Sequence, residues 1–182
     1  PGNGTAENPY RIENYEITAD NYAKPIYING TTKYFVIQNC FLSANDTAID
    51  LWKVANGTAR IENNIIVEGS NGTSGSIGVF LEYSQNVTVI RKKLGSWGNG
   101  IILLGSNHGR ILKNNSTLCK SGIRIQNSPF TRVEGNEILN NTQTSFQFIS
   151  SSNSIIRDNE FEGHNCIIYE YNLANYSTYI IE

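Results

Sequence analysis

The sequence predicts an all-β fold, namely a single-stranded, right-handed parallel β-helix (a β-solenoid) of about seven coils that forms one domain over residues 1–182. A short motif recurs every 21–29 residues along the chain, and a repeat of this length is typical of solenoids. The chain also contains 24 Ile and 25 Asn, which favour strands and turns respectively. No 3.6-residue apolar period is present, so a helical repeat is not expected.

The recurring motif is an apolar anchor followed by two polar residues, an Asn and, two positions later, a second apolar residue. We expect the chain to bend at the Asn, because stacked Asn side chains can form a hydrogen-bond ladder and tolerate left-handed backbone. The basic run Arg91–Lys93 replaces the Asn in one coil, and we expect a solvated turn there that interrupts the ladder. In chain order the anchors are Ile12, Ile37, Ile61, Ile90, Leu112, Val133 and Ile156.

A second short strand follows each anchor and leads into a polar turn. One coil cannot bury its apolar side alone, whereas coils stacked about 4.8 Å apart share parallel sheets and a continuous core. Residues 1–11 are an opening segment, residues 69–76 a surface loop inserted in the third coil, and residues 177–182 the start of an unfinished coil. The second strands begin at Ile26, Ile49, Val79, Ile101, Ile123, Phe146 and Ile167.

Four segments carry a resemblance to a known family. They are the opening Gly2–Ile12, Asn63–Asn86 (NNII…IGVFLEYSQN), Gly98–His108 (GNGIILLGSNH) and Lys120–Phe130 (KSGIRIQNSPF). They resemble the pectate-lyase-like superfamily, and most closely the NosD-type β-helix repeats of archaeal and bacterial surface proteins. The resemblance extends over nearly the whole chain and implies the β-helix fold. It does not specify a function, because this fold hosts lyases, hydrolases, binding modules and structural spikes.

Charge and composition exclude several classes of partner and cofactor. The net charge of −2 gives no basic footprint for nucleic acid, and no apolar run is long enough to span a membrane. The odd cysteine count, Cys40, Cys119 and Cys166, leaves at least one free thiol or an intermolecular bridge, and we expect the cysteines to pack as small buried hydrophobes. With no Met, scattered cysteines, and His108 and His164 in turns of different coils, we expect no cofactor and no copper site.

Sequons for N-linked glycosylation (Asn-x-Ser/Thr) occur ten times. Composition alone would give about four, and most of the ten fall at expected turns, where a glycan can be accepted. This pattern predicts N-linked glycans and an extracellular or cell-surface location. The candidate sites are Asn3, Asn29, Asn45, Asn56, Asn71, Asn86, Asn114, Asn115, Asn140 and Asn175.

The expected outward side of the second strands carries few acids and many apolar residues. Asp50 and Glu82 could be neighbours on adjacent coils, but no Asp cluster for Ca²⁺ is present, so we expect no catalytic residues. An apolar stripe of this kind marks an interface, although a register shift of one residue would exchange the two faces. The interface candidates are Tyr27, Trp52, Phe80, Ile102, Leu104, Ile149 and Ile168, with Tyr179 and Ile181 in the last segment.

These observations predict a non-enzymatic extracellular structural glycoprotein that binds copies of itself in a cell-surface filament or layer. Neither end of the solenoid has an amphipathic helix as a cap, and an open strand edge can pair with another chain. A polysaccharide-binding or polysaccharide-cleaving β-helix is the alternative, with the aromatic stripe as its binding surface. The chain could also be one module of a longer surface protein that supplies the caps.

Overall fold

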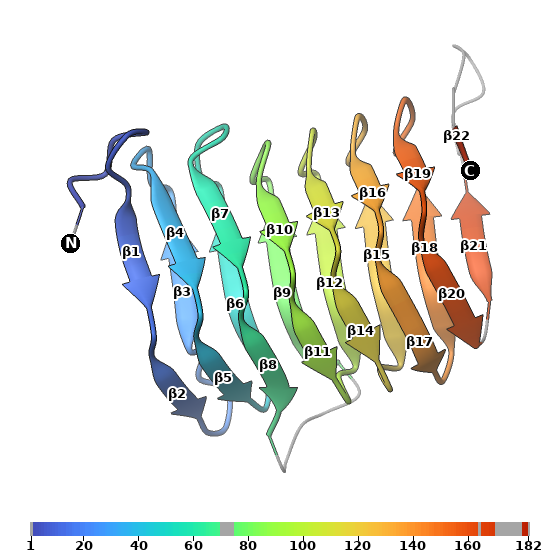
Figure 1. Ribbon diagram of the computed structural model, residues 1–182. Helices are drawn as coiled ribbons and strands as arrows, with labels where there is room; N and C mark the ends of the chain where they lie inside the picture. Colours follow the sequence, from blue (N-terminus) through green and yellow to red (C-terminus); the bar gives the residue numbers. More distant parts are fainter. Residues whose placement is uncertain (1, 70–74, 164, 170–179, 182) are drawn as a thin grey trace.

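A computed structural model describes residues 2–69, 75–163, 165–169 and 180–181, and these residues form strands and turns only (Figure 1). Each coil contributes one strand to each of three parallel sheets, which we call sheets A, B and C. The predicted β-solenoid of about seven coils is therefore confirmed. The described part of the chain contains no helix that could span a membrane.

Sheet A has eight strands, and sheets B and C have seven each. Sheet A consists of β1 (Tyr10–Glu13), β4 (Phe35–Gln38), β7 (Ala59–Glu62), β10 (Thr88–Ile90), β13 (Arg110–Leu112), β16 (Arg132–Glu134), β19 (Ile155–Arg157) and β22 (Ile180–Ile181). Sheet B consists of β2 (Glu16–Ala19), β5 (Phe41–Ala44), β8 (Ile65–Glu68), β11 (Lys93–Gly95), β14 (Asn115–Thr117), β17 (Glu137–Asn141) and β20 (Glu160–Gly163). Sheet C consists of β3 (Ile26–Asn29), β6 (Thr47–Trp52), β9 (Ile77–Glu82), β12 (Asn99–Leu104), β15 (Ser121–Gln126), β18 (Thr144–Ile149) and β21 (Cys166–Tyr169).

The repeated motif is two strands rather than one. Its anchor lies on sheet A, its second apolar residue lies on sheet B, and the bend between them is at the Asn, as Ile61 on β7 and Ile66 on β8 illustrate. The residue just before the ladder position has left-handed backbone in most coils, for example Asn63 with φ 52°. The strands that follow each motif form sheet C. A coil therefore has three sides, where the sequence predicted two strands.

Two predicted anchors are wrong by one residue. Val89, not Ile90, pairs with Ile61, and Ile111, not Leu112, pairs with Val89. Ile90 and Leu112 lie on the outward side of sheet A and are only half-buried. The error arose because each site offers two apolar residues in a row, so the apolar pattern alone does not fix the register.

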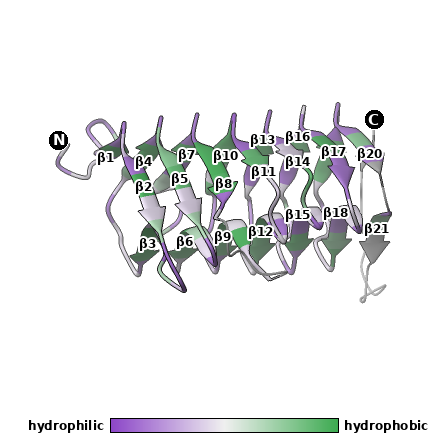
Figure 2. Cartoon of the chain, turned by 90° about the horizontal axis from the view of Figure 1, so that it is seen from below, coloured by the Kyte–Doolittle hydropathy of each residue, from purple (hydrophilic) through white to green (hydrophobic). Residues whose placement is uncertain are grey.

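The core is a column of apolar side chains enclosed by the three sheets. The inward residues Ile37, Ile61, Val89, Ile111 and Val133 form one row of this column, and none of them is exposed. Between the strands, the loops that lead into sheet A are hydrophilic (Figure 2). At the first coil the column is less covered, because Ile12, Ile17 and Ile28 are only partly buried.

The predicted Asn ladder is confirmed between sheets A and B. Asn136 Oδ1 accepts a hydrogen bond from the backbone N–H of Asn114 at 2.9 Å, and Asn136 Nδ2 donates to the Ile111 carbonyl at 2.9 Å. Asn159 makes the same two bonds one coil further on. A second ladder, which the sequence analysis did not predict, runs along the turns after sheet C through Ser84, Ser106, Ser128 and Ser151.

The opening segment and the two irregular stretches are described only in part. Tyr34 donates its backbone N–H to the Gly4 carbonyl, which ties the opening segment to the second coil. Residues 70–74 of the predicted loop 69–76 lie outside the described residues. Of the predicted unfinished coil 177–182, Ile180 and Ile181 form β22 and pair with β19.

Candidate functional site

The outer side of sheet C, which we call the sheet C face, carries the predicted apolar stripe. Tyr27, Phe80 and Ile102 share one outward row, while Trp52 and Leu104 lie in the next row with Ile149. Tyr27 is 51% exposed and the others are half-buried. The inward neighbours Ile49, Val79 and Ile101 are fully buried. The register is therefore the predicted one over these coils, and the alternative with exchanged faces is excluded.

Of the remaining interface candidates, Ile168 does not join this face as predicted, and Tyr179 and Ile181 belong to the last segment. Ile168 pairs with the buried Phe148, so Ile167 takes the outward position beside Gln147. This register differs by one residue from the prediction, because β21 offers two adjacent Ile residues. Ile181 pairs with Ile156 on sheet A, not on sheet C. Tyr179 lies outside the described residues.

The two acids of the sheet C face are not set against each other. Asp50 pairs in register with Phe80, whereas Glu82 pairs with Trp52. Lys24 donates to Asp50 Oδ2 at 2.6 Å, and Asp50 is only 5% exposed. Burial alone would lower the pKa of Lys24, but the hydrogen bond and charge of Asp50 outweigh it, so the pKa is raised. Asp50 is therefore held as an ion pair beside the stripe.

Two charged side chains on the sheet C face, Glu82 and Arg124, have no ionic partner among the described residues. Glu82 forms no ion pair within the described ranges. Arg124 donates to Gln126 Oε1 at 2.6 Å, but its buried Nε has no hydrogen-bond partner in the part of the chain that the structure describes. Lys53 lies over the Trp52 ring at 4.6 Å from the centroid. The face thus combines an apolar centre with one free acid and one incompletely bonded guanidinium.

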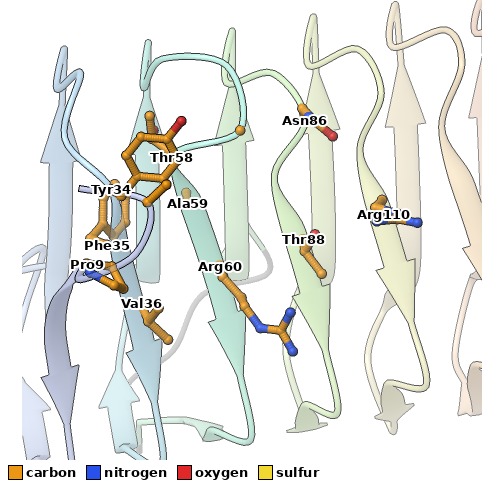
Figure 3. Close-up of a pocket in the computed structure, with 12 residues that line it drawn as sticks. Pro9, Tyr34, Phe35, Val36, Thr58, Ala59, Arg60, Asn86, Thr88 and Arg110 are labelled. Atoms are coloured by element: carbon orange, nitrogen blue, oxygen red, sulfur yellow. The ribbon is translucent and has the colours of Figure 1, made fainter. Parts of the chain in front are cut away.

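A groove with a volume of about 290 Å³ lies over sheet A, beside the opening segment (Figure 3). The outward side chains of Val36, Arg60, Thr88 and Arg110 come from four successive strands and line it. Further lining residues are Pro9, Tyr34, Thr58, Gly57 and Asn86. The sequence pattern did not predict this groove, although the Asn-Gly-Thr turn at residues 56–58 marks its corner.

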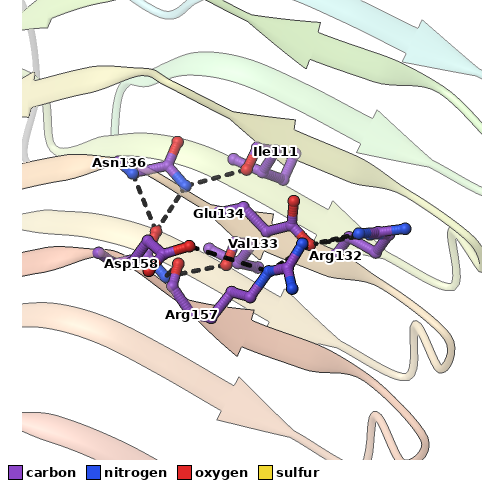
Figure 4. A network of polar contacts seen from close by, with 8 residues as sticks. Ile111, Arg132, Val133, Glu134, Asn136, Arg157 and Asp158 are labelled. Atoms are coloured by element: carbon purple, nitrogen blue, oxygen red, sulfur yellow. Dashed lines mark hydrogen bonds and ion pairs between the residues drawn. The ribbon is translucent and has the colours of Figure 1, made fainter. Parts of the chain in front are cut away.

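Elsewhere on the outer side of sheet A, Glu134 lies between two arginines, Arg132 and Arg157 (Figure 4). Glu134 Oε1 lies 2.6 Å from Arg132 and 3.2 Å from Arg157. Burial alone would raise the pKa of Glu134, but the two arginines outweigh it and hold the pKa below its ordinary value. Arg110 has Leu112 at the position where β16 has Glu134 and β10 has Ile90, so no carboxylate flanks it on its own strand.

Lys92 occupies the Asn position of the ladder in the fourth coil. Its backbone N–H donates to Asn114 Oδ1 at 3.0 Å, but its side chain is 2% exposed and Nζ has no hydrogen-bond partner among the described residues. Burial lowers the pKa of Lys92 to about 6. The expectation of a solvated turn is therefore wrong for this residue. The burial of Lys92 could not be predicted from composition, because lysine side chains are ordinarily solvent-exposed.

The sequons fall into four groups, namely buried, half-buried, exposed, and outside the described residues. Asn114 is a buried ladder residue whose Nδ2 donates to the Val89 carbonyl, and Asn45 is also buried, so a glycan on either is incompatible with this fold. Asn115 is half-buried and donates to Glu137 at 2.8 Å. Asn71 and Asn175 lie outside the described residues. The exposed sequons are Asn3, Asn29, Asn56, Asn86 and Asn140.

The three cysteines are unpaired, and two of them are buried. Cys40 and Cys119 lie inside the solenoid, where burial raises the pKa of the Cys119 thiol. Cys166 is exposed at the start of β21, and partial burial raises the pKa of its thiol as well.

His108 lies in a turn and stacks on Phe130, with ring centroids 4.9 Å apart.

Comparison with known proteins identifies the family. A family model described as periplasmic copper-binding protein (NosD) matches residues 8–179. Searches of curated proteins and of solved structures gave no match. The described residues do not fit a copper site, because no three His, Cys, Asp or Glu side chains among them gather closely enough to hold a metal ion. Since the family model covers nearly the whole chain, the chain belongs to the NosD family.

Proposed function

We propose that this member of the NosD family is a non-enzymatic structural protein of the cell envelope that associates with copies of itself through the sheet C face. The observation that carries the proposal is the apolar centre of that face. Ile102 and Leu104 lie outward on the middle strand, β12, with Phe80 and Trp52 on one side and Ile149 on the other. A solitary solenoid gains nothing from presenting such a stripe to water.

The order of residues along the face fits a two-fold symmetric contact. A two-fold axis that lies in the interface, parallel to the strands and directly over β12, would place Ile102 and Leu104 against their own copies, since an isologous interface is self-complementary. The same axis would place Trp52 against Ile149. It would also bring the free acid Glu82 opposite Gln126, next to Arg124. Apolar residues thus meet at the centre, with opposite charges beside them.

The size of the face is sufficient for a modest interface. Five six-residue strands about 20 Å long and two four-residue strands about 13 Å long, spaced about 4.8 Å apart, give roughly 600 Å² per molecule and about 1,200 Å² for a pair. Specific interfaces begin at about this area. We therefore expect a reversible dimer rather than a permanent one.

A second contact would extend dimers into a filament or layer. An apolar hollow of about 280 Å³ lies beside the first coil and is lined by Ile12, Tyr15, Ile17, Pro25, Ile26, Tyr27 and Ile28. We propose that a coil of a neighbouring molecule covers it. The envelope location rests on the description of the family as periplasmic and on the abundance of sequons. Copper binding is not part of the proposal.

Sedimentation velocity over a range of concentrations tests the proposal. The wild-type chain should form dimers or larger species, and Leu104→Arg should shift the equilibrium to monomer. Leu139→Arg is the matched control, because Leu139 is an outward, half-buried leucine on sheet B. A wild-type chain that stays monomeric at its highest soluble concentration would refute the proposal.

The alternative is a polysaccharide-binding protein that uses the same face. It is favoured by the presence of Tyr27, Trp52 and Phe80 on one surface, because aromatic rings can stack on sugars. A glycan array with wild-type and Trp52→Ala chains separates the two functions. Glycan binding that is lost in Trp52→Ala would support this alternative, and an empty array would count against it.

A further inference from the structure

The groove over sheet A contains a sequon whose attachment atom is free. Asn86 is exposed and lines the groove together with Thr88, the third residue of its sequon. Asn86 Nδ2 makes no hydrogen bond within the described part of the chain. Among the sequons with described side chains, Asn114 and Asn115 instead use their amides in hydrogen bonds.

The neighbouring corner provides room next to that atom. Gly57, Asn86, His108 and Phe130 are the left-handed residues at the corner between sheets C and A in successive coils. Gly57 alone among these four has no side chain, and Asn86 Nδ2 lies 3.4 Å from the position that a Cβ of Gly57 would occupy. The nitrogen is thus next to the gap left by Gly57, at the mouth of the groove.

We propose that Asn86 carries an N-linked oligosaccharide whose first sugars lie in the groove over sheet A. The inference rests on the envelope location in the proposed function, but not on self-association. In the transfer, Asn86 Nδ2 forms a bond to the anomeric carbon of a lipid-linked oligosaccharide phosphate or pyrophosphate. The bond from that carbon to the phosphate oxygen breaks, Nδ2 loses one proton, and the lipid phosphate leaves. The cell's oligosaccharyltransferase would catalyse this step.

The lining of the groove suits a sugar. Its volume of about 290 Å³ is at the lower end for ligand clefts, so it admits about one or two sugar rings. Tyr34 and Pro9 offer apolar surface to the C–H faces of a ring, and Thr88 offers a hydroxyl. The guanidinium of Arg60 donates through Nε to Glu62 and has further N–H groups for sugar oxygens.

Glycopeptide mass spectrometry of the protein isolated from the cells that make it tests the attachment. The peptide with Asn86 should carry a glycan, and the peptide with Asn114 should be bare. Asn86→Gln should lower the intact mass by that glycan, whereas Asn56→Gln, the sequon across the same corner, should leave the Asn86 glycan in place. A bare Asn86 would overturn the proposal and leave the sedimentation test of self-association unaffected.

Glycosidase digestion of the folded protein tests the position of the glycan. A glycan in the groove should be released slowly, and Tyr34→Ser should speed its release several-fold. If Tyr34→Ser does not fold, Gly57→Asn replaces it, because Asn tolerates the φ of 75° at this position and its side chain would fill the gap. Equal release from wild type and the variant that folds would show that the sugars do not lie in the groove.

Discussion

The two halves of the Asn ladder differ in composition although the coils around them are alike. In the C-terminal half, Asn114, Asn136 and Asn159 follow one another, and each amide oxygen accepts from the preceding coil. In the N-terminal half, Cys40 and Lys92 stand on either side of the single Asn64. The sheets run through both halves without a break. Parallel strand pairing therefore maintains the stack, and the ladder adds stability where it is continuous.

Lys92→Asn should give the largest effect, because it removes the buried amine of Lys92 and restores the ladder. The folded-state pKa of Lys92 is about 6, against an ordinary value of 10.5. Between these values the unfolded chain binds the extra proton, so wild-type stability should rise with pH. The variant should lose this dependence of stability on pH, and its free energy of unfolding at neutral pH should exceed that of the wild type by on the order of 3–5 kcal/mol.

Urea unfolding at pH 7 and pH 9 measures both parts of this prediction. Lys93→Asn is the matched control, because Lys93 is the exposed neighbour on β11 and should not change the slope. A Lys92→Asn chain with wild-type stability and a wild-type pH slope would show that the amine is not buried as described.

Asn136→Ala should give the next largest effect, a loss of about 2–4 kcal/mol in the free energy of unfolding. It would leave the buried Asn114 N–H and the Ile111 carbonyl without partners. Asn64→Ala should cost less, because Asn64 bonds to the backbone of Cys40 and Ile37 but to no ladder amide. Urea unfolding of both variants at one pH would show which substitution lowers the free energy of unfolding more. Equal losses would contradict the claim that the ladder contributes more stability in the C-terminal half.

Glu134→Gln should give the smallest effect, below about 1 kcal/mol, because the carboxylate and its arginines are partly exposed. The pKa of Glu134 is lowered in the folded state, so its contribution is present above its ordinary pKa of 4.5 and is lost as the pH falls below that value. Thermal unfolding of variant and wild type should differ at pH 7 and converge in acid. A difference that persists in acid would point to packing instead of charge.

The repeat length and the Asn positions were enough to predict the solenoid, its ladder and most of the outward stripe. The prediction of register was wrong where two apolar residues are adjacent, as at Val89–Ile90 and Ile167–Ile168, because hydrophobicity does not distinguish the inward from the outward residue there. In the structure, the left-handed residue that precedes each ladder position shows the register in the first case. Arg91 precedes Lys92, so the inward anchor of this coil is Val89 and not Ile90. The groove could not be predicted, because it is formed by four coils and the opening segment together.

The central claim is that the sheet C face binds its own copy around β12, and cross-linking tests it most directly. Leu104→Cys in a Cys166→Ser background places a thiol next to the proposed axis and removes the exposed native thiol. A short bismaleimide should then give one covalent dimer. The same treatment of Leu139→Cys on sheet B should give none. Failure of Leu104→Cys to cross-link, or equal cross-linking of both variants, would contradict the account.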